Sequence, residues 1–201
     1  MERLIIRKVS RVVRTCIDSM DPKIRKIIFT SKRDQETTID YKTFDVRYQG
    51  TTDCLVTSVW MQPSKSILIR NTNHSELALN DLSIVLSNPK LHLKSLEIRS
   101  DAEKLKGLHP YLQSLSHKIR VEKVEIRTED SIEETMILPY LKPESLKEIE
   151  IRMYDYCLRR GRPYSGSEVC VERLKRLSEM VQCQKTKMLT LYSIIHQSFP
   201  I

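Results

Sequence analysis

The sequence predicts an α/β fold in which an open, curved sheet carries helices on one face, preceded by an N-terminal helix and a short β-rich zone. The motifs LEIRS at 96–100, VEIRT at 124–128 and IEIRM at 149–153 recur at intervals of 25 to 28 residues. Repeats of about 20–50 residues are typical of stacked supersecondary units. Helical patterns separate the motifs, and each motif alternates apolar and polar residues. These observations favour a leucine-rich-repeat-like architecture.

Residues 2–19 form the first predicted helix. Apolar residues recur at steps of three and four from Ile5 to Met20, while Arg and Lys fill the opposite face. The helix should end at Asp21, because the residue before a proline avoids helical backbone angles. Charges interrupt this segment every few residues, so it lacks the apolar run of a signal peptide.

The β-rich zone follows between residues 23 and 61. Three stretches rich in β-branched and aromatic residues predict strands at 23–31, 38–48 and 54–61. The polar stretch QGTTD at 49–53 predicts a turn between the second and the third.

From residue 66 onward, strands alternate with helices, which favours parallel pairing. Helical periodicity predicts helices at 75–87, 102–116, 131–142 and 168–182. Strands are predicted at the three motifs, at a looser copy, ILIRN at 67–71, and at 187–193. The polar, glycine-containing stretch 155–167 is predicted to be a loop insertion.

Each motif places an apolar residue between two charges. Ile98 lies between Glu97 and Arg99, and the same order recurs at Ile126 and Ile151. Because side chains alternate across a strand, one face of the sheet should be apolar and the other polar. Helices are therefore expected on one side only.

In-register stacking would place equivalent residues in columns, with neighbouring strands about 4.8 Å apart. The predicted columns on the polar face are Arg70, Arg99, Arg127 and Arg152, and beside them Glu97, Glu125 and Glu150. Exposed ion pairs contribute only about 0–1 kcal/mol each. The columns are therefore read either as an ordinary solvated face or as a recognition surface.

The composition and the absence of known motifs argue against several classes of function for this protein. The chain has 34 Lys and Arg against 26 Asp and Glu, a formal charge of +8, but the interspersed acids disfavour a dedicated nucleic-acid binder. The five cysteines form no dense framework, which predicts reduced thiols and an intracellular protein, cytoplasmic or nuclear. The sequence has no membrane-spanning apolar stretch and no catalytic, cofactor or metal motif. We expect no enzyme, no cofactor and no membrane partner.

Two stretches resemble known families. The run LIIRKVSRVVRTCIDSMDP is similar to the C-terminal half of an F-box, through Arg7, Val9, Ser10, Arg11, Val13, Arg14 and Asp18. LNDLSIVLSNPKLHLKSLEI (79–98), VEKVEI (121–126), ILPYLKPESLKEIEI (137–151) and LSEMVQCQKTKMLTL (177–191) resemble the FTH, or DUF38-type, domain that accompanies F-boxes in nematode proteins. The resemblance implies an N-terminally truncated F-box at 1–20 and an FTH-like domain at 21–201.

The resemblance also implies a function. An F-box protein of this kind is the non-catalytic subunit that recruits substrates to an SCF-type ubiquitin ligase. The implied partners are a Skp-type adaptor and an unknown client protein. The implied adaptor contacts are Leu4, Ile5, Val9, Val12 and Val13. The expected client surface is Arg99, Arg127, Arg152, Glu97, Glu125, Glu150, Arg159, Arg160, Arg162 and Tyr164. A basic nucleic-acid-binding domain and a truncated F-box decoy without a ligase are the alternatives.

Overall fold

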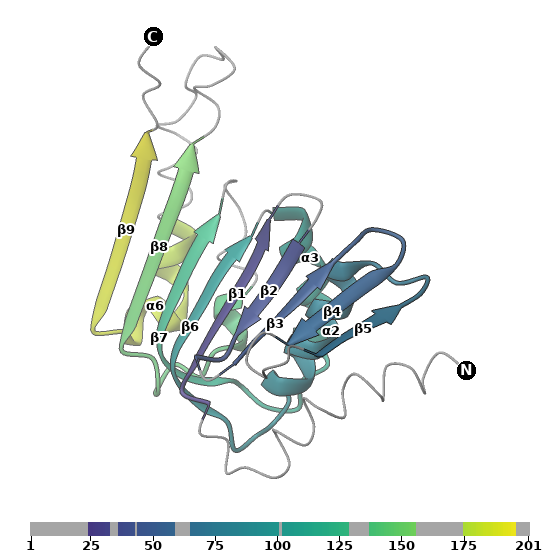
Figure 1. Ribbon diagram of the computed structural model, residues 1–201. Coiled ribbons are helices and arrows are strands. Elements are labelled where there is room, and N and C mark those ends of the chain that lie inside the picture. Colours follow the sequence, from purple (N-terminus) through teal and green to yellow (C-terminus); the bar gives the residue numbers. More distant parts are fainter. Residues whose placement is uncertain are drawn as a thin grey trace, which may run out of the picture.

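The structure is a mixed α/β fold built on one nine-stranded sheet (Figure 1). The computed structural model describes residues 24–32, 36–42, 44–58, 65–100, 102–128, 137–155 and 175–195. The strand order is β5-β4-β3-β2-β1-β6-β7-β8-β9. Strands β1 to β5 form an antiparallel meander, whereas β1 and β6 to β9 run parallel. The leucine-rich-repeat-like curvature stays a prediction.

The strands of the antiparallel half are β1 (Lys26–Lys32), β2 (Glu36–Asp40), β3 (Asp45–Gln49), β4 (Cys54–Ser58) and β5 (Lys65–Ile69). The parallel half adds β6 (His92–Ser100), β7 (Arg120–Thr128), β8 (Glu148–Asp155) and β9 (Met188–Ile195). The helices are α2 (His74–Leu86), α3 (Ala102–Gln113), the 3₁₀ helix η1 (Leu138–Tyr140) and α6 (Val181–Lys185).

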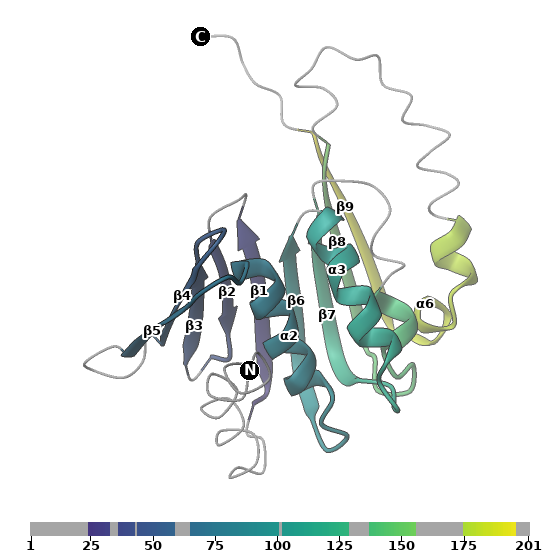
Figure 2. The same cartoon turned by 90° about the vertical axis from the view of Figure 1, so that its right-hand side faces the viewer.

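The three motif copies stack in register, as predicted. Ile98 pairs with Ile126, which in turn pairs with Ile151, and all three side chains are fully buried. Helices α2 and α3 pack on this apolar face of the sheet, and Figure 2 shows both on the same side. The arrangement leaves the Glu and Arg of each motif on the opposite face.

The prediction that ILIRN at 67–71 is a fourth copy is wrong. Strand β5 lies at the far end of the antiparallel half, and β1 takes the place beside β6, where Phe29 pairs with Ile98 and Thr30 with Arg99. Arg70 lies in the turn after β5, outside the column. In β1, Ile27 and Phe29 are both fully buried, whereas Ile67 and Leu68 in the edge strand are exposed. The strand beside β6 is therefore β1, whose Ile27 and Phe29 are covered, and not the edge strand β5.

The β-rich zone is also corrected. It continues the same sheet, and the predicted strand 38–48 is two strands, β2 and β3, joined by a tight turn. The Tyr41 amide donates to the Phe44 carbonyl at 2.9 Å, and the two rings stack with centroids 4.6 Å apart. Lys42 has a φ of +67°, and its amide donates to the Asp40 carboxylate. These local contacts turn the chain back on itself, although the composition of the stretch predicts one continuous strand.

The start of each parallel strand departs from simple alternation. The amides of Lys94 and Ser95 both donate to the Arg25 carbonyl, at 2.7 and 3.1 Å, in the manner of a β-bulge. As a result, Leu93 and Leu96 are both buried despite their three-residue spacing. The same spacing of buried residues recurs at Val121 and Val124 and at Leu146 and Ile149.

Other predicted elements are described in part or not at all. The helix predicted at 75–87 is α2, capped where the Asn73 side chain accepts a hydrogen bond from the Ser75 amide at 2.7 Å. The helix predicted at 131–142 is described only from residue 137, where the chain forms η1. The helix predicted at 2–19 and residues 156–167 of the loop prediction lie outside the described residues. Within the described ranges, no helix has the length and apolarity to cross a membrane.

Candidate protein-interaction surface

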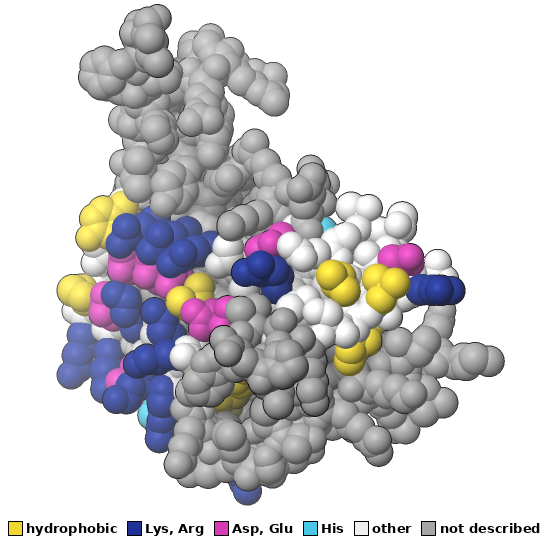
Figure 3. All heavy atoms as spheres, in the orientation of Figure 1, with side chains coloured by type: hydrophobic (Ala, Val, Ile, Leu, Met, Phe, Trp, Pro, Cys, Tyr) yellow, Lys and Arg dark blue, Asp and Glu magenta, His cyan; other side chains and the backbone are white. Residues whose placement is uncertain are grey.

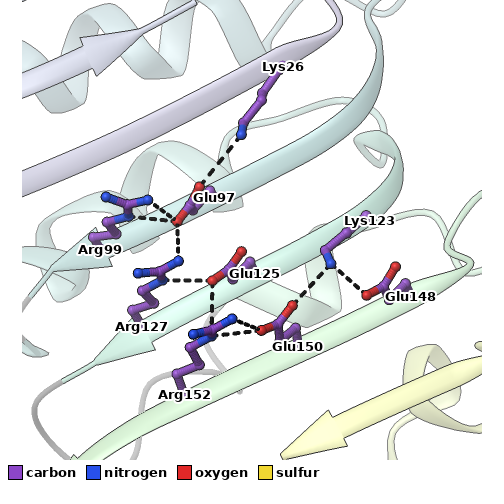
Figure 4. A network of polar contacts seen from close by, with 9 residues as sticks. All are labelled: Lys26, Glu97, Arg99, Lys123, Glu125, Arg127, Glu148, Glu150 and Arg152. Carbon is purple, nitrogen blue, oxygen red and sulfur yellow. Dashed lines mark hydrogen bonds and ion pairs between the residues drawn. The ribbon is translucent and has the colours of Figure 1, made fainter. Parts of the chain in front are cut away.

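The polar face of β6, β7 and β8 carries a connected row of charges, which we call the charged ladder: Lys26, Glu97, Arg99, Lys123, Glu125, Arg127, Glu148, Glu150 and Arg152 (Figure 4). Parallel register creates it, because Glu97 pairs with Glu125 and Glu125 with Glu150. The arginines two positions further along pair in the same way. The predicted Glu and Arg columns are therefore confirmed over three strands.

Each arginine binds a glutamate on its own strand. The Nε atoms of Arg99, Arg127 and Arg152 donate to the glutamate two residues earlier, at 2.6, 2.7 and 2.7 Å. Two of them also reach the preceding strand, because Arg127 lies 3.2 Å from Glu97 and Arg152 lies 3.2 Å from Glu125. The contacts therefore run without a break from β6 to β8.

Two lysines complete the ladder. Lys26 on β1 lies 3.9 Å from Glu97. Lys123 on β7 contacts Glu150 at 3.0 Å and Glu148 at 2.6 Å. Five cations thus face four carboxylates, and Arg127 and Arg152 each bridge two successive glutamates of the column.

The glutamates are not the exposed outward charges that alternation suggests. The side chains of Glu97, Glu125 and Glu150 are only 4%, 11% and 9% exposed. Those of Arg99, Arg127 and Arg152 are 40%, 26% and 34% exposed. The guanidinium groups lie across the carboxylates, so the ladder presents arginine to the solvent over a buried layer of acid.

This arrangement shifts the pKa values of its members. Burial would raise the pKa of Glu150, but hydrogen bonds from Lys123 and Arg152 outweigh it, and the pKa lies below its ordinary value. The hydrogen bond to Glu150 raises the pKa of Arg152, and hydrogen bonds to Glu148 and Glu150 raise that of Lys123. All three pKa shifts favour the charged forms of Glu150, Arg152 and Lys123.

Tyr192 on β9 extends the surface, and the sequence analysis missed it. Its ring lies opposite Arg152 in the register, and the guanidinium carbon is 5.1 Å from the ring centroid. The side chain is 46% exposed. Tyr and Arg are enriched at the residues that dominate binding energy in protein interfaces. Counting strand positions from Leu189 would have placed Tyr192 on the ladder face.

The same face continues across the antiparallel half with a different character. Leu55 on β4 and Leu68 on β5 pair in register and are 38% and 55% exposed. Figure 3 shows hydrophobic side chains over this end of the sheet and charged ones over the parallel half. One face of the molecule therefore offers a charged region and a small apolar region.

The structure brings together six of the predicted site residues: Arg99, Arg127, Arg152, Glu97, Glu125 and Glu150. The other client-surface predictions, Arg159, Arg160, Arg162 and Tyr164, lie outside the described residues. So do the predicted adaptor contacts Leu4, Ile5, Val9, Val12 and Val13. Among the described residues, no three His, Cys, Asp or Glu side chains form a group that could hold a metal ion.

The second half of the chain is similar to a known family. Residues 102–201 match the FTH domain. No curated protein matches the sequence. The FTH match begins at α3 and includes β7, β8 and β9, so it contains two of the three strands that form the ladder together with Tyr192.

The FTH match supports the part of the predicted resemblance that concerns this domain. The strand β6, with Glu97 and Arg99, precedes the match but pairs with β7 through eight residue pairs. The ladder therefore joins the FTH segment to the strand before it. The F-box resemblance at 1–20 stays a prediction.

Proposed function

We propose that this chain is a non-catalytic protein-interaction module that holds a client protein on the charged ladder. The observation that carries the proposal is the continuous Glu–Arg row, which fixes three guanidinium groups and Tyr192 on a sheet face. Rigid, repeated side chains on a sheet are the kind of surface that repeat proteins use for binding. The FTH domain's association with F-box proteins supports the same role.

The wider assignment is a substrate-recruiting subunit of an SCF-type ubiquitin ligase. In it, residues 2–19 would contact a Skp-type adaptor and other subunits would supply catalysis. The resemblance of this segment to the second half of an F-box supports it. A partial interface below about 1,000 Å² is typical of weak contacts, so we expect adaptor binding weaker than nanomolar. The alternative within this class is a decoy that binds clients without the ligase.

Quantitative affinity purification tests both parts of the proposal. Arg99→Ala with Tyr192→Ala removes the arginine on β6 and the tyrosine beside Arg152, while Glu97 keeps contacts with Lys26 and Arg127. We expect this variant to lose a set of client proteins that the wild type captures, and to retain the adaptor. Arg47→Ala is the matched control, because Arg47 is a half-exposed arginine on the same face with one ion pair, to Glu36.

The results of this purification distinguish client binding on the ladder, a decoy without a ligase, and nucleic-acid binding. Equal loss of clients in the control and the ladder variant would contradict the ladder as the binding surface. Client capture without an adaptor would favour the decoy. Nucleic-acid binding, which the charge of +8 favours, would instead appear as RNA or DNA that leaves the protein steeply with salt.

A further inference from the structure

A second site lies at the amino ends of the parallel strands, away from the ladder. A pocket of about 550 Å³ opens there, and its walls are the segments that lead into β6, β7, β8 and β9. Four of its lining residues are cations, Lys118, Arg120, Lys142 and Lys185, and one is an acid, Glu144. The volume falls in the range of about 300–1,000 Å³ that is usual for ligand sites.

Hydrogen bonds hold the walls of this pocket together. The Ile119 amide donates to the Tyr140 carbonyl and the Lys142 amide donates to the Ile119 carbonyl, both at 2.8 Å. The buried side chain of Gln182 donates from its Nε2 atom to the Leu141 carbonyl at 3.3 Å, which joins α6 to the same segment. The cations are therefore mounted on backbone whose position is fixed before a ligand arrives.

The charge of the pocket is unbalanced, unlike that of the ladder. Lys185 lies 3.3 Å from Glu144. Lys118, Arg120 and Lys142 form no side-chain hydrogen bond or ion pair within the part of the chain that the structure describes. His117 also lines the pocket, and its shielded Nδ1 has no hydrogen-bond partner there. Glu144 also interacts with Lys142, but four cations around this one carboxylate leave an excess of positive charge that attracts an anion.

The surrounding surface adds to this potential. Lys94, Lys147 and Lys187 stand at the starts of β6, β8 and β9, and all three are exposed. Figure 3 shows Lys and Arg side chains gathered over this end of the parallel strands. Among the three, Lys147 has an acidic partner, Glu122 at 2.9 Å.

We propose that this pocket binds a phosphate monoester carried by a peptide side chain. A phosphorylated side chain brings close to two negative charges and three acceptor oxygens, which match the cationic donors of Lys118, Arg120 and Lys142. Pro89, Pro143 and Val181 supply apolar walls for the neighbouring peptide residues. The pocket is separate from the ladder, so this inference stands without the proposed function.

Single-stranded nucleic acid is the less fitting partner. Proteins that bind it stack bases on aromatic side chains along a groove. The described lining of the pocket includes no Phe, Tyr or Trp. The pocket can therefore recognise a phosphate but offers no platform for a base.

Fluorescence anisotropy of the full chain with a degenerate phosphoserine peptide library tests the proposal. We expect the phosphorylated library to bind at least about tenfold more tightly than the same library with serine, since hydrogen bonds between cations and a phosphate are among the strong ones. Arg120→Gln and Lys142→Gln should each weaken binding about tenfold. Lys147→Gln removes the same charge from the same end of the sheet, and should change binding less than twofold.

Each remaining result would overturn the proposal. Equal weakening by Lys147→Gln would show diffuse electrostatic attraction without a site. Inorganic phosphate that competes at the same concentration as the library would show an anion site without peptide recognition. A single-stranded RNA octamer that binds more tightly, and is lost with Arg120→Gln, would assign the pocket to nucleic acid. Thermal melts of each variant confirm that it folds, because Arg120 is exposed and Lys142 is partly exposed, and neither has a side-chain partner to lose.

Discussion

Single residues of the ladder have unequal roles, because burial divides them. The glutamates are nearly covered, and each one forms an ion pair with the arginine two residues further along its strand. The arginines cover them with part of each side chain and leave the rest exposed. An arginine can therefore both stabilise the sheet and contact a partner. Tyr192 in the edge strand is exposed and covers no glutamate. Variants that test binding should accordingly spare the arginines in the middle of the row.

The isoleucine at the centre of a motif should be essential to the core. Ile126→Ala removes a fully buried side chain between Ile98 and Ile151, and we expect a loss of about 2–5 kcal/mol in the free energy of unfolding. Urea denaturation measures it. Ile67→Ala is the control, because Ile67 is 47% exposed and its loss should be much smaller. Equal losses would contradict the burial of Ile126 at the centre of the core.

Asp81 on α2 should make stability depend on pH. It is fully buried and accepts a hydrogen bond from the Tyr48 hydroxyl at 2.8 Å, with Cys54 nearby. Burial raises the pKa of Asp81 from 3.8 to about 6, against the opposing effect of the Tyr48 hydrogen bond. The folded protein therefore holds this proton more tightly than the unfolded chain. The contribution to stability is complete below the unfolded pKa and is lost as pH rises through about 6.

Asp81→Asn tests this dependence, since the amide oxygen can still accept from Tyr48 and carries no charge. The variant should gain stability relative to the wild type between pH 4 and pH 7, by at most about 3 kcal/mol. Urea denaturation at both pH values gives the difference and cancels the other titrating groups. A difference that does not change with pH would show that Asp81 has an ordinary pKa.

Ion pairs between neighbouring strands connect the ladder across β6, β7 and β8. Arg127 links β7 to β6, and Arg152 links β8 to β7. From the sequence, these charges are expected to be exposed, and each ion pair is expected to contribute only about 0–1 kcal/mol. Their contacts with covered glutamates reverse that expectation.

Arg127→Glu with Arg152→Glu should lower the melting temperature, because each change removes the partner of a covered glutamate and leaves that charge unpaired. The melting temperature measures the effect. Lys147→Glu is the control, since Lys147 is 59% exposed at its side chain and its loss should have little effect. An unchanged melting temperature for the double variant would mean that the glutamates are hydrated.

Across the whole molecule, the parallel half of the sheet was easier to predict from the sequence than the antiparallel half. The motifs gave the register of β6 to β8 and the side that α2 and α3 cover, since period-two alternation and helical spacing are local properties. The position of β5 was not predictable from ILIRN, because pairing with β6 depends on which strand buries more apolar surface. In the structure, Ile27 and Phe29 of β1 are fully buried and pair with residues of β6.

The sequence predicted which residues form the candidate site. It did not predict that the glutamates among them are buried. Glu97, Glu125 and Glu150 were placed on the correct face, yet single-strand alternation does not show that an arginine side chain folds over its neighbour. The pocket at the strand starts was not predicted, because Lys118, Lys142 and Lys185 are far apart in the sequence. Their approach depends on the bridge between Ile119 and Leu141.

The ladder's role in holding a client is tested most directly by a photo-reactive benzoylphenylalanine placed at position 192 of the full chain in cells. We predict cross-links from this position to one or a few proteins, and a loss of these cross-links when Arg99→Ala is added. The same group at position 68, on the apolar end of the same face, serves as the comparison. Cross-links that form at position 68 and not at position 192 would contradict the ladder as the binding surface.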